Sequence, residues 1–301
     1  MLKGRHHTAD LMVRPLDAPL GAVITGVDLS EPLDGRIRQQ ILKAWHSHII
    51  LLFPEQELDG PAQLGFAEIF GEIKKRGRPN ERRPDLGVHD YESQVMFISN
   101  VKENGKPIGS LPDGEMWFHH DGCYKKKPQR ASFLYAIELP SVGGNTKFAN
   151  MYLAYNAISK ELKKLLTDKT VLNVYDYEVR KTFELETGLE NVSHFSQPIF
   201  IRHPNTNKVA LYVNPLMTAK INELPKDESD DVLAELFVIS QDQSVVYEHI
   251  WTVNDLLVWD NLCSMHARTD FPAEERRLLR RCVVEGETVI AANPIIPTQP
   301  H

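Results

Sequence analysis

The sequence predicts a mainly β fold with flanking helices, an antiparallel sandwich or barrel and not a doubly wound parallel sheet. Short apolar segments with period-two patterning recur along the chain, while helical patterns gather near its beginning, around 158–166 and around 232–239. No G-x-G-x-x-G or G-x-x-x-x-G-K-[ST] motif follows any of the expected strands. Nucleotide binding through those loops is therefore unsupported.

Two helices are expected in the first part of the chain. Asp34 can cap a helix that carries Ile41 and Trp45 on one apolar stripe, and Asp59-Gly60-Pro61 opens a second helix that ends at Gly71. Between them, 49–53 is expected to be a strand buried on both faces. The later expected strands are Val95–Val101, Ser132–Leu139, Ile199–Arg202, Ala210–Val213, Val246–Trp251, Leu256–Trp259 and Leu278–Val284.

Composition and charge restrict the class of protein. A chain of 301 residues with 42% hydrophobic and 25% charged residues can bury a core without disulfides or structural metals. We expect one domain over 1–301, although two small domains are possible. The formal net charge of -7 argues against a nucleic-acid binder. The short basic run Lys74, Lys75, Arg76, Arg78 is expected to be a solvated loop.

Cysteine usage and hydropathy indicate the compartment. The three cysteines, Cys123, Cys263 and Cys282, lie far apart without a C-x-x-C pair, so neither a disulfide framework nor a zinc ribbon is expected. No stretch approaches the roughly 18 apolar residues that a membrane span needs. We expect a soluble, cytoplasmic protein that does not bind membranes.

One segment offers two metal ligands at close spacing. His119 and Asp121 are two positions apart, and on an extended strand such side chains leave the same face. A third ligand, His266, follows a strongly apolar strand far downstream. Two imidazoles and one carboxylate leave half of an octahedral metal open, which suits non-haem Fe(II) and O2 chemistry more than zinc. By itself, H-x-D is also compatible with a structural histidine and a capping aspartate.

Two further features could bind an anion beside this metal. Arg277 and Arg281 share a face of the expected strand, where they could clamp a carboxylate or simply form a solvated face. The turn Gly143-Gly144-Asn145-Thr146 delivers a hydroxyl donor into the next strand, or is only a tight turn.

Taken in order, these segments resemble the Fe(II)/2-oxoglutarate dioxygenases of the taurine dioxygenase and phenoxyalkanoate dioxygenase (TauD/TfdA) family. The likeness covers nearly the whole chain, and the ordered set is more specific than any one motif. Its segments are 21–29, 66–71, His119 to Asp121, 143–146, His203-Pro204, 211–214, 259–266 and the arginine strand.

The resemblance implies a double-stranded β-helix (jelly-roll, cupin-like) core and a defined set of roles. His119, Asp121 and His266 would hold Fe(II), while Arg277, helped by Thr146, would bind the far carboxylate of 2-oxoglutarate. Arg281 would face an acidic group on the substrate. With O2, such an enzyme hydroxylates a small anionic molecule, a sulfonate or a carboxylate, and releases succinate and CO2. Relatives are commonly oligomeric, so a homodimer or homotetramer is expected.

The chain departs from the family pattern at two places. Phe118 separates Trp117 from His119, and Gln197 stands where the family commonly has a histidine before Pro198. We assign the ligand to His119 because H-x-D is then intact, and we expect His120 on the opposite face, behind the ligands or at the surface.

The stretch 74–115 is rich in Gly, Pro and charge, so we expect a lid or specificity insertion. Within it, Asn100 to Glu115, and Asn100 in particular, are expected to contact the substrate.

Two other classes of protein remain as alternatives. A jelly-roll binding protein could keep the fold without turnover, and a mononuclear metal hydrolase could use the same ligands. The complete ligand triad together with Arg277 favours the oxygenase, because a hydrolase has no use for a carboxylate clamp.

Overall fold

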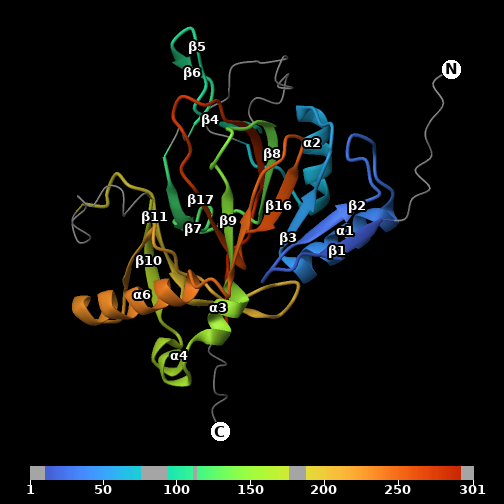
Figure 1. The fold of residues 1–301 in the computed structure, drawn as a ribbon. Coiled ribbons are helices and arrows are strands. Elements are labelled where there is room, and N and C mark those ends of the chain that lie inside the picture. Colours follow the sequence, from blue (N-terminus) through green and yellow to red (C-terminus); the bar gives the residue numbers. More distant parts are fainter. Residues whose placement is uncertain (1–10, 76–93, 111–113, 176–187, 293–301) are drawn as a thin grey trace, which may run out of the picture.

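The computed structural model describes residues 11–75, 94–110, 114–175 and 188–292, and its core consists of two β-sheets (Figure 1). The larger sheet has the strand order β1-β2-β3-β16-β8-β18-β4, and the smaller has β15-β9-β17-β7. The strands of the larger sheet are Met12–Pro15, Ala22–Thr25, Ile50–Phe53, Leu256–Asp260, Ala131–Glu138, Leu278–Val284 and Met96–Ser99. Those of the smaller sheet are Val246–His249, Thr146–Asn150, Ser264–Arg268 and Met116–His119.

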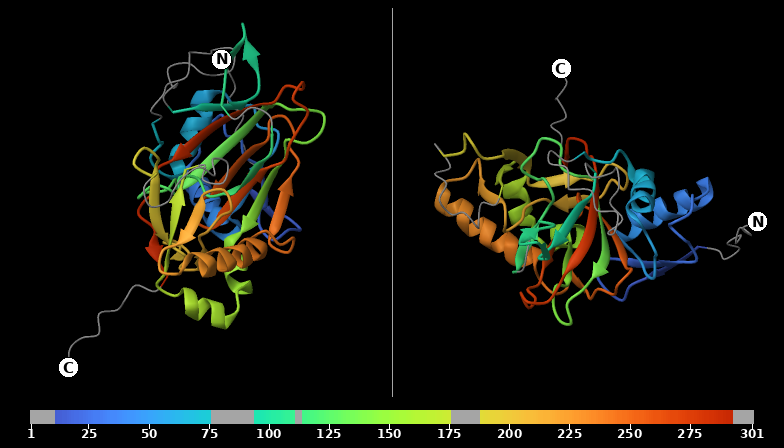
Figure 2. Two further views of the ribbon diagram at one scale, coloured as in Figure 1. Left: turned by 90° about the vertical axis from the view of Figure 1, so that its left-hand side faces the viewer. Right: turned by 90° about the horizontal axis from the view of Figure 1, so that it is seen from above.

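The path of the chain through these sheets is that of a jelly roll. Along the chain, successive strands alternate between two sets of four: β16-β8-β18-β4 in the larger sheet and β15-β9-β17-β7 in the smaller one. Only the step from β9 to β15 stays within one sheet. All pairs within these two sets are antiparallel. Two such four-stranded sets, packed face to face (Figure 2), form the double Greek key of a jelly roll. The predicted fold class, mainly β with flanking helices, is confirmed.

Apolar side chains from both sheets form the interior. Phe148 of the smaller sheet belongs to the same buried cluster as Leu134, Trp259 and Leu279 of the larger one. Since alternate residues of each strand point inward, any polar side chain on the same face is placed inside the roll.

Helices cover the outer face of the larger sheet. They are α1 (Gly35–His48) and α2 (Gly60–Ala67), the latter continued by the 3-10 helix η1 (Glu68–Phe70). Asp34 and Asp59 cap α1 and α2 as the sequence predicts, each accepting a hydrogen bond from a backbone N–H three residues on. Phe66 and Phe133 belong to the buried cluster between these helices and the sheet.

The remaining helices and two small sheets lie together at one end of the roll, away from α1 and α2 (Figure 1). Helices α3 (Met151–Ala157), α4 (Lys160–Leu166) and α6 (Lys226–Ser240) accompany two three-stranded sheets, β11-β10-β14 and β13-β12-β19. Their strands are His194–Pro198, Thr170–Val174, Thr218–Ile221, Val209–Leu211, Phe200–Arg202 and Ile290–Ala291. None of the described helices is long and apolar enough to cross a membrane.

The predicted insertion at 74–115 is in part a core segment. Its strand β4 pairs with β18 in the larger sheet, and the two-residue strands β5 (Lys102–Glu103) and β6 (Lys106–Pro107) form a hairpin beyond it. The parts of this segment at 76–93 and 111–113, including Arg76 and Arg78, lie outside the described residues. The division of the chain into one domain stays a prediction.

Candidate active site

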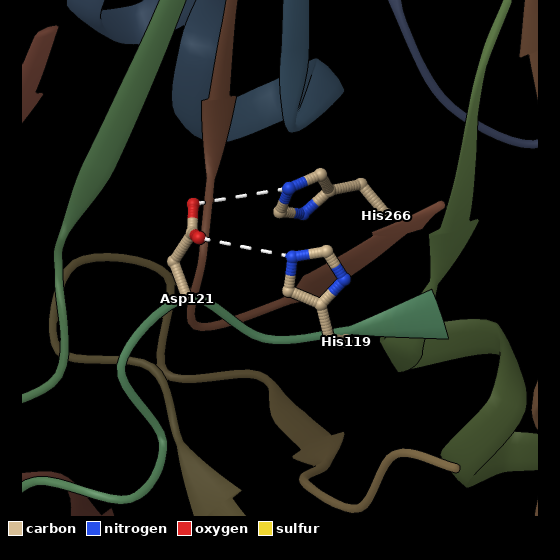
Figure 3. Close-up of side chains that lie close together, drawn as sticks. All are labelled: His119, Asp121 and His266. Atoms are coloured by element: carbon tan, nitrogen blue, oxygen red, sulfur yellow. Dashed lines mark ion pairs between the residues drawn. The ribbon is translucent and has the colours of Figure 1, made fainter. Parts of the chain in front are cut away.

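His119, Asp121 and His266 meet inside the roll, as the sequence predicts (Figure 3). His119 ends β7 and is the cross-strand partner of His266 on β17, so their rings lie 4.2 Å apart between centroids. Asp121 faces both: Oδ1 is 3.9 Å from His119 Nε2, and Oδ2 is 3.9 Å from His266 Nε2. The three donors therefore converge on one point.

The local geometry that we expected for the first two ligands is wrong. Strand β7 stops at His119, and Asp121 begins a turn, with Gly122 at a φ of 72° and the Asp121 carbonyl accepting a hydrogen bond from Gln129 N. Asp121 thus faces the two imidazoles because the chain turns, not because strand residues two apart share a face. A positive φ needs a residue without Cβ strain, which Gly122 supplies.

Both histidines are suited to donate a lone pair. Nδ1 of His119 lies 2.9 Å from the Trp117 carbonyl, which fixes its proton there and leaves Nε2 unprotonated toward the other ligands. Burial, and then the neighbouring His119, hold the pKa of His266 well below its usual range, so this ring is neutral. Neutral imidazoles are the forms that bind metal ions.

Asp121 is ionised although it is buried. Burial by itself would raise the pKa of Asp121, but Arg281, His266, His119 and the Ser132 hydroxyl together hold it well below its usual range. Among the described residues, the close-lying group around this carboxylate contains no fourth histidine, cysteine or acidic ligand. Two nitrogens and one oxygen with open positions fit Fe(II) better than a closed zinc site.

A cavity beside these ligands contains the predicted anion-binding residues. His119, Thr146, His266, Arg277 and Arg281 all line it. Its other walls are Ile98, Met116, Leu134, Trp259, Ala267 and Arg268. The structure therefore brings together every predicted ligand and cosubstrate residue.

Arg277 is a buried cation at the wall of this cavity. Only 1% of the residue is exposed, and its Nε and Nη2 donate to the Gly144 carbonyl at 3.2 and 2.9 Å. Nη1 has no hydrogen-bond partner within the described part of the chain. Burial, and then nearby Arg268, lower the pKa of Arg277 to about 9. This guanidinium is positioned to receive an anion.

Arg281 lines the cavity and already contacts Asp121. Its Nη2 donates to Asp121 Oδ2, to Ser132 Oγ at 3.2 Å and to Gln129 Oε1 at 3.3 Å. Its Nε is buried and has no partner among the described residues. One side of the guanidinium thus holds Asp121 while the Nε–H is available to a ligand.

Asn100 does not line the cavity. Its amide nitrogen donates to the Ala273 and Glu275 carbonyls, and its Oδ1 accepts from Arg277 N at 2.9 Å. Its expected contact with the substrate stays a prediction, and the observed contacts give it a different role: they hold the backbone that leads into Arg277.

The two departures from the family pattern have structural roles near the ligands. His120 is fully buried against the Tyr212 ring, at 4.4 Å between centroids, so it lies behind the ligands and not at the surface. Gln197 is buried as well and donates to the carbonyls of Cys123 and Lys125. Gln197 therefore holds the turn that follows Asp121.

Several residues of the site were not predicted from the sequence. Ser132 Oγ donates to Asp121 Oδ2 at 2.7 Å, and Asn261 Nδ2 donates to Ser132 Oγ at 3.0 Å. Arg268 lies two residues after His266, and its guanidinium donates to the Gly114 carbonyl. Strand alternation from His266 could have placed Arg268 in the cavity, whereas the Ser132 contact depends on strand order.

A second group of ligand-type side chains, His203, Asp260 and Cys263, is a structural cluster. Arg130 forms an ion pair with Asp260 and lies 3.0 Å from His203 Nε2. His203 Nε2 also lies 2.9 Å from Asp260 Oδ2. Because a guanidinium occupies the place that a cation would take, we assign this cluster to the fold.

Comparison with known proteins shows the family to which the chain belongs. Residues 12–283 match the family described as "Taurine catabolism dioxygenase TauD, TfdA family". Pentalenolactone F synthase of Streptomyces avermitilis is 32% identical over 282 residues, which cover 88% of this chain and 90% of that protein. The (S)-phenoxypropionate/alpha-ketoglutarate-dioxygenase of Sphingobium herbicidovorans is 27% identical over 292 residues, 91% of this chain and 95% of that protein.

Solved structures show the same fold. A taurine dioxygenase from Burkholderia xenovorans superposes with a TM-score of 0.77 at 24% identity, over 93% of this chain and 91% of that one. The structure of AAD-2 in complex with Mn(II) and N-oxalylglycine gives a TM-score of 0.76 at 25% identity, over 92% of this chain and all of that one (100%). The chain belongs to the TauD/TfdA family and is a 2-oxoglutarate-dependent dioxygenase.

Proposed function

We propose that this protein is an Fe(II)-dependent oxygenase that uses 2-oxoglutarate and O2 to hydroxylate a small organic acid. The observation that carries the proposal is the convergence of His119, Asp121 and His266 beside the buried cation Arg277. A ferrous ion at this position would supply O2 activation coupled to oxidative decarboxylation of 2-oxoglutarate to succinate and CO2.

The residues of this chain would bind and orient the reactants. Arg277 would pair with the far carboxylate of 2-oxoglutarate, and the Thr146 hydroxyl, which accepts from Trp251 Nε1 at 3.0 Å, keeps its own proton to donate to the same group. The largely buried walls would exclude water and hold the substrate C–H close to the metal. A binding protein without turnover would not need three ligands beside a carboxylate clamp.

The charge of the cavity supports an anionic substrate. Arg268, Arg277 and Arg281 line it, and among the described residues Asp121 is the one carboxylate grouped with the two histidines beside it. A sulfonate or carboxylate with a partly apolar body would suit Arg281 together with Met116 and Ile98. Relatives named for phenoxypropionate and for sulfonate dioxygenation support that class.

The proposed chemistry is tested by adding Fe(II) and 2-oxoglutarate to the protein without O2. We expect a visible charge-transfer band from 2-oxoglutarate bound to Fe(II). Under air, with a panel of sulfonates and carboxylic acids, we expect succinate release that depends on one of these compounds. Metal content measured on the same sample distinguishes the alternatives: zinc with no 2-oxoglutarate band would support a hydrolase, and the band without turnover would support a binding protein.

Replacing the carboxylate ligand tests the site. Asp121→Ala should abolish the charge-transfer band and turnover, because one of three metal donors is lost and Arg281 remains as an unpaired charge beside the metal. The exposed Asp231→Ala in α6 is the matched control and should behave as wild type. A fully active Asp121→Ala protein would refute the ligand assignment.

Two further properties belong to the proposal. The separated cysteines favour a reducing, cytoplasmic compartment, and all three are buried and free. We also propose a homo-oligomer, a dimer or tetramer, which light scattering would test; a monomer at working concentration would contradict it.

A further inference from the structure

A buried chain of hydrogen bonds leads from the larger sheet to the metal ligand Asp121. We propose that Ser132 and Asn261 are positioning residues that hold Oδ2 of Asp121 and so present Oδ1 to the metal. The inference deepens the proposed function and rests on its metal assignment.

The chain has three links. Trp259 Nε1 donates to Asn261 Oδ1 at 2.9 Å, Asn261 Nδ2 donates to Ser132 Oγ at 3.0 Å, and Ser132 Oγ donates to Asp121 Oδ2 at 2.7 Å. Ser132 and Asn261 are fully buried, and Trp259 is 1% exposed. The links join neighbouring strands of the larger sheet, where Ser132 on β8 pairs directly with Trp259 on β16.

The direction of the chain follows from its donors. An indole nitrogen can only donate, so the Asn261 side chain must turn its oxygen to Trp259 and its amide nitrogen to Ser132. A serine hydroxyl has two acceptor sites and one proton. Both acceptor sites are used, by Asn261 and by Arg281 Nη2 at 3.2 Å. The only proton of Ser132 therefore goes to Asp121.

This arrangement distinguishes the two carboxylate oxygens. Oδ2 accepts hydrogen bonds from Ser132 and from Arg281, and these two bonds occupy the lone pairs of Oδ2. Oδ1, 3.9 Å from His119 Nε2, keeps its lone pairs for a metal. The positioning is needed because Asp121 lies in a turn beyond β7, where no strand pairing orients its side chain.

Loss of these hydrogen bonds should weaken metal binding by the protein without 2-oxoglutarate or substrate. Ser132→Ala removes one hydroxyl and adds no atom, so the fold should be retained. Asn261→Asp keeps the acceptor for Trp259 but replaces the donor with an oxygen that attracts the Ser132 proton away from Asp121. For each variant we expect a metal dissociation constant about tenfold or more above wild type, since outer-shell changes typically cost 10–100-fold.

The measurement is anaerobic titration with Fe(II) and with Co(II), combined with the visible spectrum of the Co(II) protein and a thermal melt without metal. A purely structural role would lower the melting temperature and leave the affinity and spectrum of the folded protein unchanged. Ser240→Ala is the matched control, because Ser240 is also fully buried and its hydroxyl donates one hydrogen bond, to Phe237 in α6.

The outcomes separate this inference from the proposed function. If wild type binds Fe(II) and both variants bind it equally with an unchanged Co(II) spectrum, the positioning role is overturned while the metal site stands. If wild type itself binds neither metal, the proposed function fails first. Weaker binding and a shifted Co(II) spectrum in either folded variant, with Ser240→Ala unchanged, support the positioning role.

Discussion

A single buried arginine gives the clearest indication of the ligand. The Arg277 side chain lies inside the protein with one carbonyl acceptor and, within the described residues, no carboxylate ion pair. An uncompensated buried cation costs several kcal/mol, so such a residue is kept where a ligand supplies the negative charge. Its lowered pKa, to about 9, still leaves it charged at neutral pH.

Arg277→Gln should raise the KM for 2-oxoglutarate roughly a hundredfold, because loss of a buried charged partner costs about 2–5 kcal/mol and 1.4 kcal/mol is tenfold. Steady-state kinetics with varied 2-oxoglutarate check this. The neighbouring Arg276→Gln is the control, since Arg276 is an exposed side chain paired with Glu138. An unchanged KM in Arg277→Gln would contradict the assignment.

At the residue scale, the sequence supplied residue types and spacings. It predicted His119, Asp121, His266, Thr146 and Arg277 as one site. The structure places four of them on the wall of one cavity and Asp121 beside the two histidines. It did not predict that Arg281 contacts Asp121, because that contact spans 160 positions of the chain.

Among the elements, the turn between β8 and β9 contributes most to the pocket. Gly143 and Gly144 both have positive φ, at 74° and 65°, and the Gly144 carbonyl accepts from Arg277. A Cβ on Gly144 would lie 2.8 Å from Arg277 Nε. The paired glycines therefore both form the turn and let Arg277 approach it.

Gly144→Ala should lower the free energy of unfolding by about 1–2 kcal/mol, because alanine is strained at this φ, and should also raise the KM for 2-oxoglutarate by displacing Arg277. Urea unfolding and kinetics on the same preparation check both effects. Gly35→Ala is the control, since no atom lies within 4 Å of its added Cβ and it begins helix α1. A Gly144→Ala protein with unchanged stability and unchanged KM would contradict the close packing of Arg277 against Gly144.

Elements with strong local signals were predicted, and those without were missed. The capped helices and the strands at 96–99 and 278–284 lie where patterning and caps predict them. Helix α6 begins at Lys226, well before the predicted 232–239, because its first turns are polar and carry no apolar period. Strand β17, which carries His266, contains no β-branched residue and no Phe, Tyr or Trp, so it lacks the composition that marks a strand.

For the molecule as a whole, a buried ion pair links separate parts of the chain. Asp260 at the end of β16 pairs with Arg130 just before β8 and lies 2.9 Å from His203, beyond β12. Burial by itself would raise the pKa of Asp260, but Arg130 and His203 more than offset it and hold this pKa well below its usual range. The cluster thus links the three-stranded sheet β13-β12-β19 to the jelly roll.

Asp260→Asn should destabilise the protein by about 3–5 kcal/mol at pH 7, because Arg130 is left buried without its partner. Since the folded pKa of Asp260 lies below the unfolded one, the unfolded chain binds more protons in the acid range. The carboxylate therefore stabilises fully above about pH 4 and progressively less below it, so the difference between the proteins should shrink there.

Urea unfolding at pH 7 and at several values below pH 4 measures this difference. The exposed Asp231→Asn in α6 serves as the control and should follow wild type. A constant gap across pH, or no gap at pH 7, would contradict a stabilising ion pair.

The sequence by itself determined the β-rich class and the helix caps, because these depend on residue type, local spacing and alternation. It predicted the candidate ligands and the arginine clamp through the ordered resemblance to the family. The tertiary structure alone decided how Asp121 is oriented, which side of the Arg281 guanidinium contacts Asp121, and that Arg130, His203 and Asp260 form one cluster. The physical reason is that these features rest on side chains brought together by strand order. Asn261 and Ser132, for example, are 129 positions apart in the chain and hydrogen-bonded in the fold.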